Sequence, residues 1–176
     1  MIICAGNNET FDFATPIGIG LVDSAINLTR LILEVGRPDM ILFIGSAGSY
    51  GKYQIFDIIE SSSAANIELG LITQSAYTPI DNTIEHAVVS HETPIMINSS
   101  NYITSDKELS KEYQKLGVEL ENMEFFSVLK TAENFEIPAY GIFVVSNFCD
   151  ENAHEDFLKN HEKAKALLSQ YIKEKD

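Results

Sequence analysis

The chain has 176 residues, a formal net charge of −14 and two cysteines. Its length favours a single domain with a core of its own. The excess of carboxylates excludes sequence-independent binding to nucleic acid or anionic membranes, which needs clustered lysine and arginine, and favours an uncharged small molecule as ligand. The cysteines form neither a disulfide framework nor a metal-binding pattern, and no signal pattern or membrane-length apolar run occurs. We therefore expect a cytoplasmic protein without a bound metal.

Apolar runs bounded by turn residues predict the strands, and helical periodicity predicts the helices. The predicted strands are Met1–Ala5, Phe11–Ile19, Met40–Ile44, Ile55–Ile59, Glu85–Ser90, Pro94–Asn98 and Tyr140–Val145. The predicted helices begin at Asp23 or Ser24, Lys107, Met123 and Asp156, and they end at Gly36, Leu116, Asn134 and Lys173. Residues 61–82 are expected to mix loop with short strand. Because strand, helix and strand alternate early in the chain, a parallel crossover unit is predicted there.

The stretch 40–51 is the most informative part of the sequence. Met40–Ile44 is uninterrupted apolar, which is typical of a strand buried on both faces of a parallel sheet. It continues into Gly45-Ser46-Ala47-Gly48-Ser49, here named the glycine-serine loop, where glycines let the backbone turn sharply and approach a ligand. Open α/β sheets bind ligands beyond the carboxyl ends of their strands, which is where this loop would lie. The alternative is a tight turn without a ligand.

Polar side chains also follow other predicted strands, and a site can form where they meet. These segments are 7–9, 18–20, 99–102 and 146–147. Glu124 emerges from apolar surroundings at the predicted start of a helix, where a carboxylate needs a partner. Its alternative role is that of a charge favoured by the helix dipole.

Four motifs, in this order, resemble the superfamily of purine nucleoside phosphorylases and methylthioadenosine nucleosidases. They are the turn Gly18-Ile19-Gly20, the run from Arg37-Pro38-Asp39 to Ile44-Gly45-Ser46-Ala47-Gly48, the segment Asn122-Met123-Glu124, similar to V-E-M-E, and Val145-Ser146-Asn147, similar to I-S-D. The resemblance runs from about Gly18 to the C-terminus. It implies an α/β protein, a three-layer α/β/α sandwich with a mixed, largely parallel central sheet. It also implies one nucleoside phosphorylase-like domain over 1–176 that cleaves the N-glycosidic bond of a nucleoside.

The resemblance further implies roles for single residues. Glu124 would bind the ribose 2′- and 3′-hydroxyls and stabilise a developing oxocarbenium ion, because a carboxylate accepts two hydrogen bonds and carries the opposite charge. Asn147 would face the base, and Glu9 is the nearest candidate for the carboxylate that activates water in the nucleosidases. The other substrate-binding candidates are Gly18, Gly20, Ser46, Ala47, Gly48, Tyr102, Ile103, Asn122, Met123 and Ser146.

Some of these candidates have an expected place in the pocket. Ser46 and the amides of Gly18–Gly20 are expected on the nucleophile side, Met123 against the sugar, and Tyr102 or its neighbour over the base. The alternatives are that Met123 belongs to the core, that Tyr102 is a surface aromatic, and that Asn147 only ties down its loop. The four histidines are expected at the surface, with His154 beside the pocket.

The sequence departs from the family pattern at three places. Asn147 stands where the nucleosidases and hexameric phosphorylases have aspartate; an amide gives up no proton, which resembles the trimeric purine phosphorylases and favours a 6-oxopurine over adenine. Phe43 stands where the hexameric phosphorylases have arginine, and no arginine follows Arg37. This favours water over phosphate as the nucleophile, or a weakened enzyme. The segment from Gly6 to Ile17 is shorter than family members usually have there.

The sequence therefore predicts an enzyme of nucleoside metabolism and purine salvage that cleaves a purine nucleoside, as a phosphorylase or as a nucleosidase. It is expected to need no cofactor, with inorganic phosphate as a possible co-substrate. The alternative is a nucleoside- or base-binding protein of the same fold that has lost catalysis. The resemblance also implies a homo-oligomer, a dimer or a trimer of dimers, with active sites at or near a subunit interface.

Overall fold

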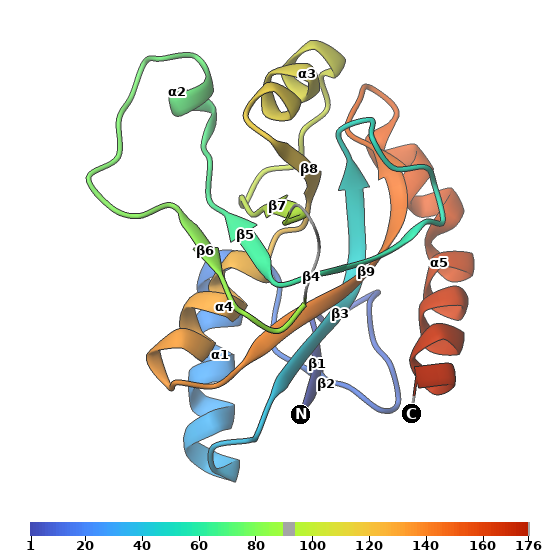
Figure 1. Ribbon diagram of the computed structural model, residues 1–176. Coiled ribbons are helices and arrows are strands. Elements are labelled where there is room, and N and C mark those ends of the chain that lie inside the picture. The colour runs from blue at the N-terminus through green and yellow to red at the C-terminus, as the bar shows by residue number, and fades with distance from the viewer. Residues whose placement is uncertain (90–93, 176) are drawn as a thin grey trace.

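The computed structural model describes residues 1–89 and 94–175 and places nine strands in one sheet with helices on both faces (Figure 1). The strands are β1 Ile2–Cys4, β2 Thr15–Pro16, β3 Ile41–Ser49, β4 Ile58–Ser61, β5 Ser63–Ala65, β6 Thr83–Glu85, β7 Met96–Asn98, β8 Val118–Glu121 and β9 Ala139–Phe148. The helices are α1 Gly20–Val35, α2 Leu69–Ile72, α3 Lys107–Lys115, α4 Phe125–Asn134 and α5 Ala153–Lys175.

Strand β3 is the centre of the sheet, because three other strands pair with it. β1 lies parallel to its first half, and β9 lies parallel to it along its whole length. β8 pairs antiparallel with its last two residues, Gly48 and Ser49, and continues the sheet through β7 and β5 to β6. β4 pairs antiparallel with β9. Parallel pairs predominate among the described strands, so the mixed, largely parallel sheet predicted from the sequence is confirmed.

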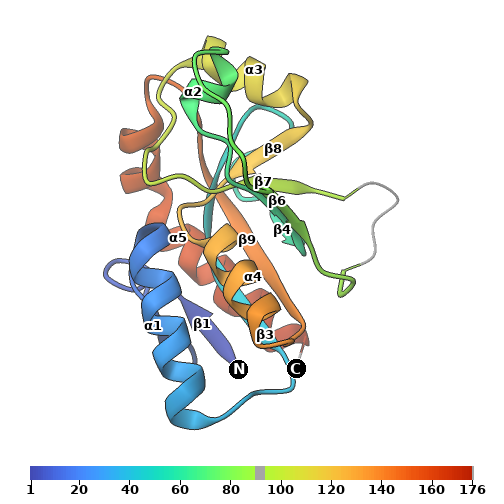
Figure 2. The ribbon, with the colours of Figure 1, turned by 90° about the vertical axis from the view of Figure 1, so that its left-hand side faces the viewer.

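The helices cover the sheet as two outer layers. Figures 1 and 2 show α1 beside α4 on one face and α5 on the opposite face. The α5 side of the core consists of Cys4, Ile44, Ile142, Val144, Ala164, Leu168 and Ile172. This arrangement confirms the predicted three-layer α/β/α fold. Within residues 1–89 and 94–175, no helix has the length and apolar character needed to cross a bilayer.

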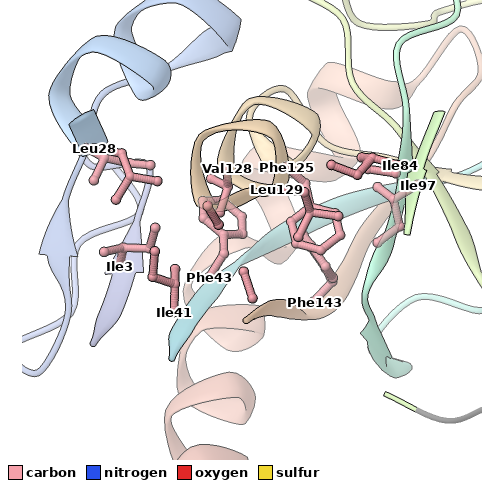
Figure 3. Packing of buried hydrophobic residues seen from close by; sticks show 14 of the residues in the cluster. Ile3, Leu28, Ile41, Phe43, Ile84, Ile97, Phe125, Val128, Leu129 and Phe143 are labelled. Carbon is pink, nitrogen blue, oxygen red and sulfur yellow. The ribbon is translucent and has the colours of Figure 1, made fainter. Parts of the chain in front are cut away.

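Three phenylalanines form the centre of the core on the α4 side of the sheet (Figure 3). Phe43 of β3, Phe143 of β9 and Phe125 of α4 are fully buried. Ring centroids lie 5.8 Å apart for the first two and 4.9 Å apart for the last two, within the range where aromatic pairs add to the energy of burial. Gly141 makes room for them, because a Cβ there would lie 2.4 Å from the ring of Phe143.

Helix α1 begins earlier than the sequence predicts. Its first residue is Gly20, and neither Asp23 nor Ser24 caps it. Ser24 is buried, and its hydroxyl donates to the Gly20 carbonyl at 2.7 Å, so it lies inside the helix and not before it. The Gly20 amide donates to the side chain of Glu124, the residue directly before α4. A partner from another part of the chain therefore takes the place of a local cap.

Two strands are longer than predicted: β3 runs on to Ser49 and β9 to Phe148, so the glycine-serine loop is not the expected turn but the last five residues of β3, because these residues pair with β9. Several other strands are shorter than predicted, and one is missed. Of the predicted strand 11–19, only β2 pairs with β1, because the chain turns at Phe11, whose carbonyl accepts from Ala14. β4 starts three residues late because Phe56, with φ 75°, lies in a turn. β6 ends at Glu85, and the last residue of the strand predicted there, Ser90, lies outside the described residues. The sequence does not predict β8, because its four residues directly after a helix are too few to show the alternation of apolar and polar side chains that marks a strand.

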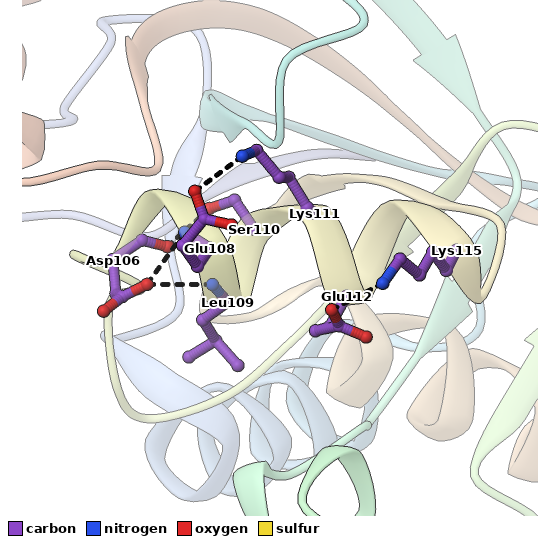
Figure 4. Close-up of polar contacts among 7 residues, drawn as sticks. All are labelled: Asp106, Glu108, Leu109, Ser110, Lys111, Glu112 and Lys115. Carbon is purple, nitrogen blue, oxygen red and sulfur yellow. Dashed lines mark hydrogen bonds and ion pairs between the residues drawn. The ribbon is translucent and has the colours of Figure 1, made fainter.

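Helix α3 has the local cap that α1 lacks. Asp106 Oδ1 accepts hydrogen bonds from the amides of Glu108 at 2.8 Å and Leu109 at 2.9 Å (Figure 4). Ser110, in the first turn, also donates its hydroxyl to the carbonyl of Cys149 just beyond β9. These bonds fix α3 at the end of the sheet where the glycine-serine loop lies.

Candidate active site

A cavity of about 460 Å³ opens at the carboxyl ends of the central strands. Its wall comes from the turn after β1, the glycine-serine loop of β3, the end of β9, the loop between β7 and α3, the link from β8 to α4, and the start of α5. Pockets of this volume, at this end of an α/β sheet, are typical of small-molecule sites. The predicted site residues that line it are Glu9, Ser46, Ala47, Gly48, Tyr102, Ile103, Asn122, Met123, Glu124, Ser146 and Asn147.

Glu9 reaches the cavity from the turn after β1 and binds the glycine-serine loop. Its Oε1 accepts a hydrogen bond from the Ser46 amide at 2.9 Å and another from the Ser46 hydroxyl. The turn is closed by a bond from the Glu9 amide to the Gly6 carbonyl at 3.0 Å. Gly45 leaves space for the carboxylate, since a Cβ there would lie 3.4 Å from Glu9 Oε2. Two separate contacts with the loop therefore fix this partly buried carboxylate.

Glu124 is a buried carboxylate in the cavity wall. It is 2% exposed, and its Oε1 accepts from the Gly20 amide at 2.8 Å. Burial raises the pKa of Glu124 to about 7; the Gly20 bond lowers it, the charge of Glu9 raises it, and a bond with Asn122 lowers it. Its side chain makes no capping bond to α4, so capping does not explain it. A carboxylate with a pKa near neutrality in a cleft is typical of functional sites.

Asn122 fixes the geometry around Glu124. Its Oδ1 accepts hydrogen bonds from the amides of Glu124 and Phe125, both at 3.0 Å, and so caps α4. Its Nδ2 donates to the Ser46 carbonyl at 3.1 Å. The sequence predicts a substrate-binding residue here, and the structure shows both ends of the amide bound within the protein. Asn122 therefore holds the start of α4 against the glycine-serine loop.

The loop between β7 and α3 forms the mouth of the cavity. Tyr102 and Ile103 line it and are 80% and 56% exposed. On one side, Asn101 Oδ1 accepts from an amide in the first turn of α1 at 2.9 Å. On the other side, the Thr104 amide donates to Glu121 at 3.0 Å. The two exposed side chains are thus carried on a loop anchored at both ends.

Asn147 and Ser146 bring the end of β9 to the cavity. The Ser146 hydroxyl donates to Asn147 Oδ1 at 2.8 Å, and Asn147 Nδ2 donates to the Phe148 carbonyl at 3.0 Å. A side-chain amide has two N–H groups and two oxygen lone pairs, so each end keeps one position for a ligand. Asn147 can therefore hold its loop in place and present hydrogen-bonding groups to the cavity at the same time.

Sequence reasoning misses Glu121, which ends β8 and lines the cavity. Its Oε2 accepts from the Tyr50 hydroxyl at 2.9 Å, and the thiol of Cys149 and the amide of Thr104 also bond to it. Burial raises the pKa of Glu121, while the bonds from Thr104 and Tyr50 lower it. Burial, together with the charge of Glu121, also raises the pKa of Tyr50. The signal that points to Glu121 is that it replaces the valine of the V-E-M-E segment.

The cavity is acidic. Glu9, Glu121 and Glu124 line it with one histidine, His154, and its lining among the described residues includes neither lysine nor arginine. Phe43, at the position of the phosphorylase arginine, is fully buried in the core. A negative wall disfavours an anionic co-substrate. In the part of the chain that the structure describes, no three histidine, cysteine, aspartate or glutamate side chains gather in a way that could hold a metal ion.

Two predicted substrate-binding residues, Gly18 and Gly20, do not line the cavity. The Gly18 amide donates to the Ala5 carbonyl at 2.9 Å, and the Gly20 amide donates to Glu124. Both amides are therefore used within the protein, and Ile19 between them lines the cavity instead. Gly20 has φ 81°, and a Cβ there would lie 2.7 Å from Asn101 Oδ1, so close packing explains this glycine.

The start of α5 supplies lining residues that local patterns do not predict. Phe157 lines the cavity and packs against the ring of His161, with centroids 5.0 Å apart. His161 is 8% exposed, so the expectation of a surface histidine is wrong there. Its Nε2 lies 2.8 Å from the carbonyl of Asn8, which links α5 to the turn that carries Glu9. His154, as expected, borders the cavity.

Solved structures of nucleosidases share this fold. A mutant of Helicobacter pylori MTAN with 5′-methylthioadenosine in its active site has a TM-score of 0.77 at 21% identity, over 92% of this chain and 78% of that one. Futalosine hydrolase of Helicobacter pylori has a TM-score of 0.76 at 22% identity, over 91% and 76%. The 5′-methylthioadenosine/S-adenosylhomocysteine nucleosidase of S. pneumoniae has a TM-score of 0.76 at 15% identity, over 97% and 95%.

The fold and the cavity at its strand ends define a protein of the nucleoside phosphorylase type. The model of the phosphorylase superfamily matches residues 3–174, and the chain belongs to this superfamily. None of the curated proteins compared with the chain matches it.

Proposed function

We propose that this protein hydrolyses the N-glycosidic bond of a purine nucleoside. The observation that carries the proposal is the pair of carboxylates, Glu9 and Glu124, in one cavity whose described lining includes no lysine or arginine. Such a wall suits a neutral nucleoside and a water molecule better than a phosphate anion. The superfamily match also supports hydrolysis of a nucleoside, as do the nucleosidases and the hydrolase among the similar structures.

Glu124 acts on the sugar. Its carboxylate accepts hydrogen bonds from two ribose hydroxyls, and its charge stabilises the oxocarbenium ion that develops as the bond to the base lengthens. The Gly20 amide binds Oε1 and fixes the direction of the carboxylate. Because burial brings the pKa of Glu124 to about 7, its ionised form becomes dominant above neutral pH.

Glu9 activates the water. Ser46 holds Oε1 with two hydrogen bonds, so Oε2 is available to accept a proton from a water on the opposite side of the sugar from the base. The water oxygen forms the new bond to C1′, its proton passes to Glu9, and the base leaves with the electron pair of the broken bond. The charge of Glu9 also adds to the negative potential around the cationic sugar.

Asn147 acts on the base. Its remaining N–H donates a hydrogen bond to an acceptor on the leaving purine, and it supplies no proton. We propose that this favours a 6-oxopurine over adenine, since the oxo base offers two neighbouring acceptors, N7 and O6, to a donor. Tyr102 at the cavity mouth covers the outer face of the base.

A panel of base-release assays tests the proposal. Inosine, guanosine, adenosine and methylthioadenosine are incubated with the protein, each with and without phosphate, and the free base is measured. Release at equal rates with and without phosphate is expected, with inosine or guanosine as the best substrate. Release that needs phosphate would make the protein a phosphorylase. Tight nucleoside binding without release would favour the alternative of a binding protein that has lost catalysis.

We also propose that the chain forms a homo-oligomer. Ile19, Val22, Ile26 and Ile103 are apolar side chains that are 42–61% exposed, and the first and last of them line the cavity mouth. Apolar surface beside a cavity is typical of interfaces. Light scattering on the purified protein is expected to give the mass of a dimer or a larger even-numbered assembly, and a monomer at micromolar concentration would refute this.

A further inference from the structure

Helix α5 carries a buried histidine that the proposed chemistry does not use. The ring of His161 lies against Phe157, and its Nε2 lies 2.8 Å from the Asn8 carbonyl. A carbonyl oxygen only accepts hydrogen bonds, so Nε2 carries the hydrogen of the imidazole and donates it. His161 is therefore a hydrogen-bond donor to the turn that carries Glu9.

Packing alone does not account for an imidazole at this position. Within the described residues 1–89 and 94–175, the other ring nitrogen, Nδ1 of His161, is buried without a hydrogen-bond partner. Such an atom destabilises the folded state, and a phenylalanine ring would pack against Phe157 without that cost. Proteins keep local costs of this kind mainly where function needs the group. What the imidazole offers and a phenylalanine lacks is the N–H bond to Asn8.

The bond from His161 completes the restraint of one peptide group. The Asn8 carbonyl and the Glu9 amide belong to the same planar unit. Its oxygen accepts from His161, and its N–H donates to the Gly6 carbonyl at 3.0 Å. Because the unit is planar, bonds at both of its ends fix the plane and, with it, the position of the Glu9 Cα. The turn needs this support, since Asn7 has φ 53°, a conformation that non-glycine residues adopt rarely.

The same turn of α5 holds a second wall of the cavity. Asn160 donates from Nδ2 to the Ser146 carbonyl at 2.8 Å, next to Asn147. Successive side chains of an α-helix diverge by about 100°, so Asn160 and His161 reach different segments. The end of β9 and the turn after β1 are thereby held separately to one helix. Loss of the His161 bond alone therefore affects the water side of the cavity and leaves the base side in place.

We propose that His161 is a positioning residue that holds Glu9 in line with the water it activates. The inference rests on the proposed function, in which Oε2 of Glu9 accepts the proton of that water. His161 does not line the cavity and acts through the Asn8 carbonyl and the backbone of Glu9. Ser46 fixes the far end of the Glu9 side chain at Oε1, and His161 fixes its origin. A misplacement of about 1 Å in a reacting group can lower a rate about 100-fold.

Two substitutions separate this role from simple packing. His161→Phe keeps a ring against Phe157 and removes the donor, whereas His161→Gln removes the ring and keeps an N–H group at a similar reach. His161→Phe is expected to have a Tm at or above the native value and a kcat lowered about 10- to 100-fold at unchanged KM. His161→Gln is expected to restore most of kcat. The matched control is His86→Phe, which removes an imidazole bonded to the Ala139 amide outside the cavity lining and is expected to leave kcat unchanged.

A second measurement needs no turnover. Hydrogen exchange is followed by NMR at the amides of Glu9 and Ser46, whose bonds depend on the turn, and at the amide of Ile41, bonded to the Pro138 carbonyl, as a reference. In His161→Phe the first two amides are expected to exchange about tenfold faster, the factor for a hydrogen bond of ordinary strength. The Ile41 amide is expected to keep its native rate.

Each outcome decides the inference. Unchanged kcat in His161→Phe, or unchanged exchange at Glu9 and Ser46, overturns the proposal. Equal losses of kcat in His161→Phe and His161→Gln would make packing the role of this residue and overturn it as well. If His161→Phe does not fold, His161→Gln decides: native kcat and native exchange support the donor role, and a loss of either refutes it. Native protein that cleaves no nucleoside would refute the proposed function, whereas the exchange rates would still decide whether His161 holds the turn of Glu9.

Discussion

Replacing Glu124 by glutamine is expected to stabilise the fold at alkaline pH while abolishing turnover. Burial lifts the pKa of this carboxyl from 4.5 to about 7. Since each tenfold change in acidity corresponds to about 1.4 kcal/mol, the ionised carboxylate costs the folded state roughly 3 kcal/mol well above pH 7. Glutamine has nearly the same shape, stays neutral, and keeps an oxygen for the Gly20 amide. The variant avoids this cost and loses the charge that the sugar needs.

The pH window follows from the direction of the shift. The folded pKa of Glu124 lies above the unfolded value, so between about pH 4.5 and 7 the folded state binds more protons. The stability of the native protein therefore falls as pH rises through this window. The advantage of Glu124→Gln is absent below it and complete above it. For a chain of this length, roughly 3 kcal/mol corresponds to a Tm increase of about 6–12 °C, which is an upper value because the new amide N–H groups need partners.

Thermal unfolding by circular dichroism at pH 5 and pH 8.5, together with base release from the best nucleoside, tests this reasoning. The control is Glu119→Gln, which alters a carboxylate paired with Lys52 and is expected to give no gain at pH 8.5. A Tm difference between Glu124→Gln and native protein that is the same at both pH values would refute the raised pKa. Near-native turnover by the variant would refute the role of Glu124 on the sugar.

Three further predictions follow from the same geometry. The kcat/KM of the native protein is expected to rise as pH passes about 7, because Glu124 must ionise, and a flat profile from pH 6 to 8 would contradict this. Glu9→Gln is expected to lower kcat at least 100-fold while nucleoside affinity changes little, and unchanged kcat in single-turnover assays would exclude Glu9 as the base. Gly141→Ala is expected to destabilise the protein by about 1–3 kcal/mol in urea titrations, because its Cβ would lie 2.4 Å from the buried ring of Phe143; unchanged stability would show that the ring can move.

Features that depend on short stretches of chain are predictable from the sequence. The apolar runs of β3 and β9 and the glycines and serines in the last part of β3 indicate buried strands ending at a site. The order of four motifs adds the three-layer fold and the superfamily. Glu124 is predicted to be a site residue because a carboxylate next to two phenylalanines needs a partner. Each motif, strand run and candidate residue is a local feature, and only the order of the motifs extends along the chain.

Features that depend on distant partners are not predictable in this way. The start of α1 and the use of the Gly20 amide are set by Glu124, which is 104 positions away in the chain. Glu121 looks like an ordinary charged residue at the end of a short strand until Gly48 and Asn147 are placed beside it. His161 is buried because α5 folds back onto the turn at Asn8, 153 positions away.

The sequence by itself determined the class of fold, the superfamily and most of the residues around the cavity, because burial patterns and turn chemistry are local properties of the chain. The tertiary structure alone decided which amides remain available to a ligand, which carboxylates share one wall, and how far the pKa of Glu124 is raised. These quantities depend on desolvation and on hydrogen bonds between segments that meet only when the sheet has formed.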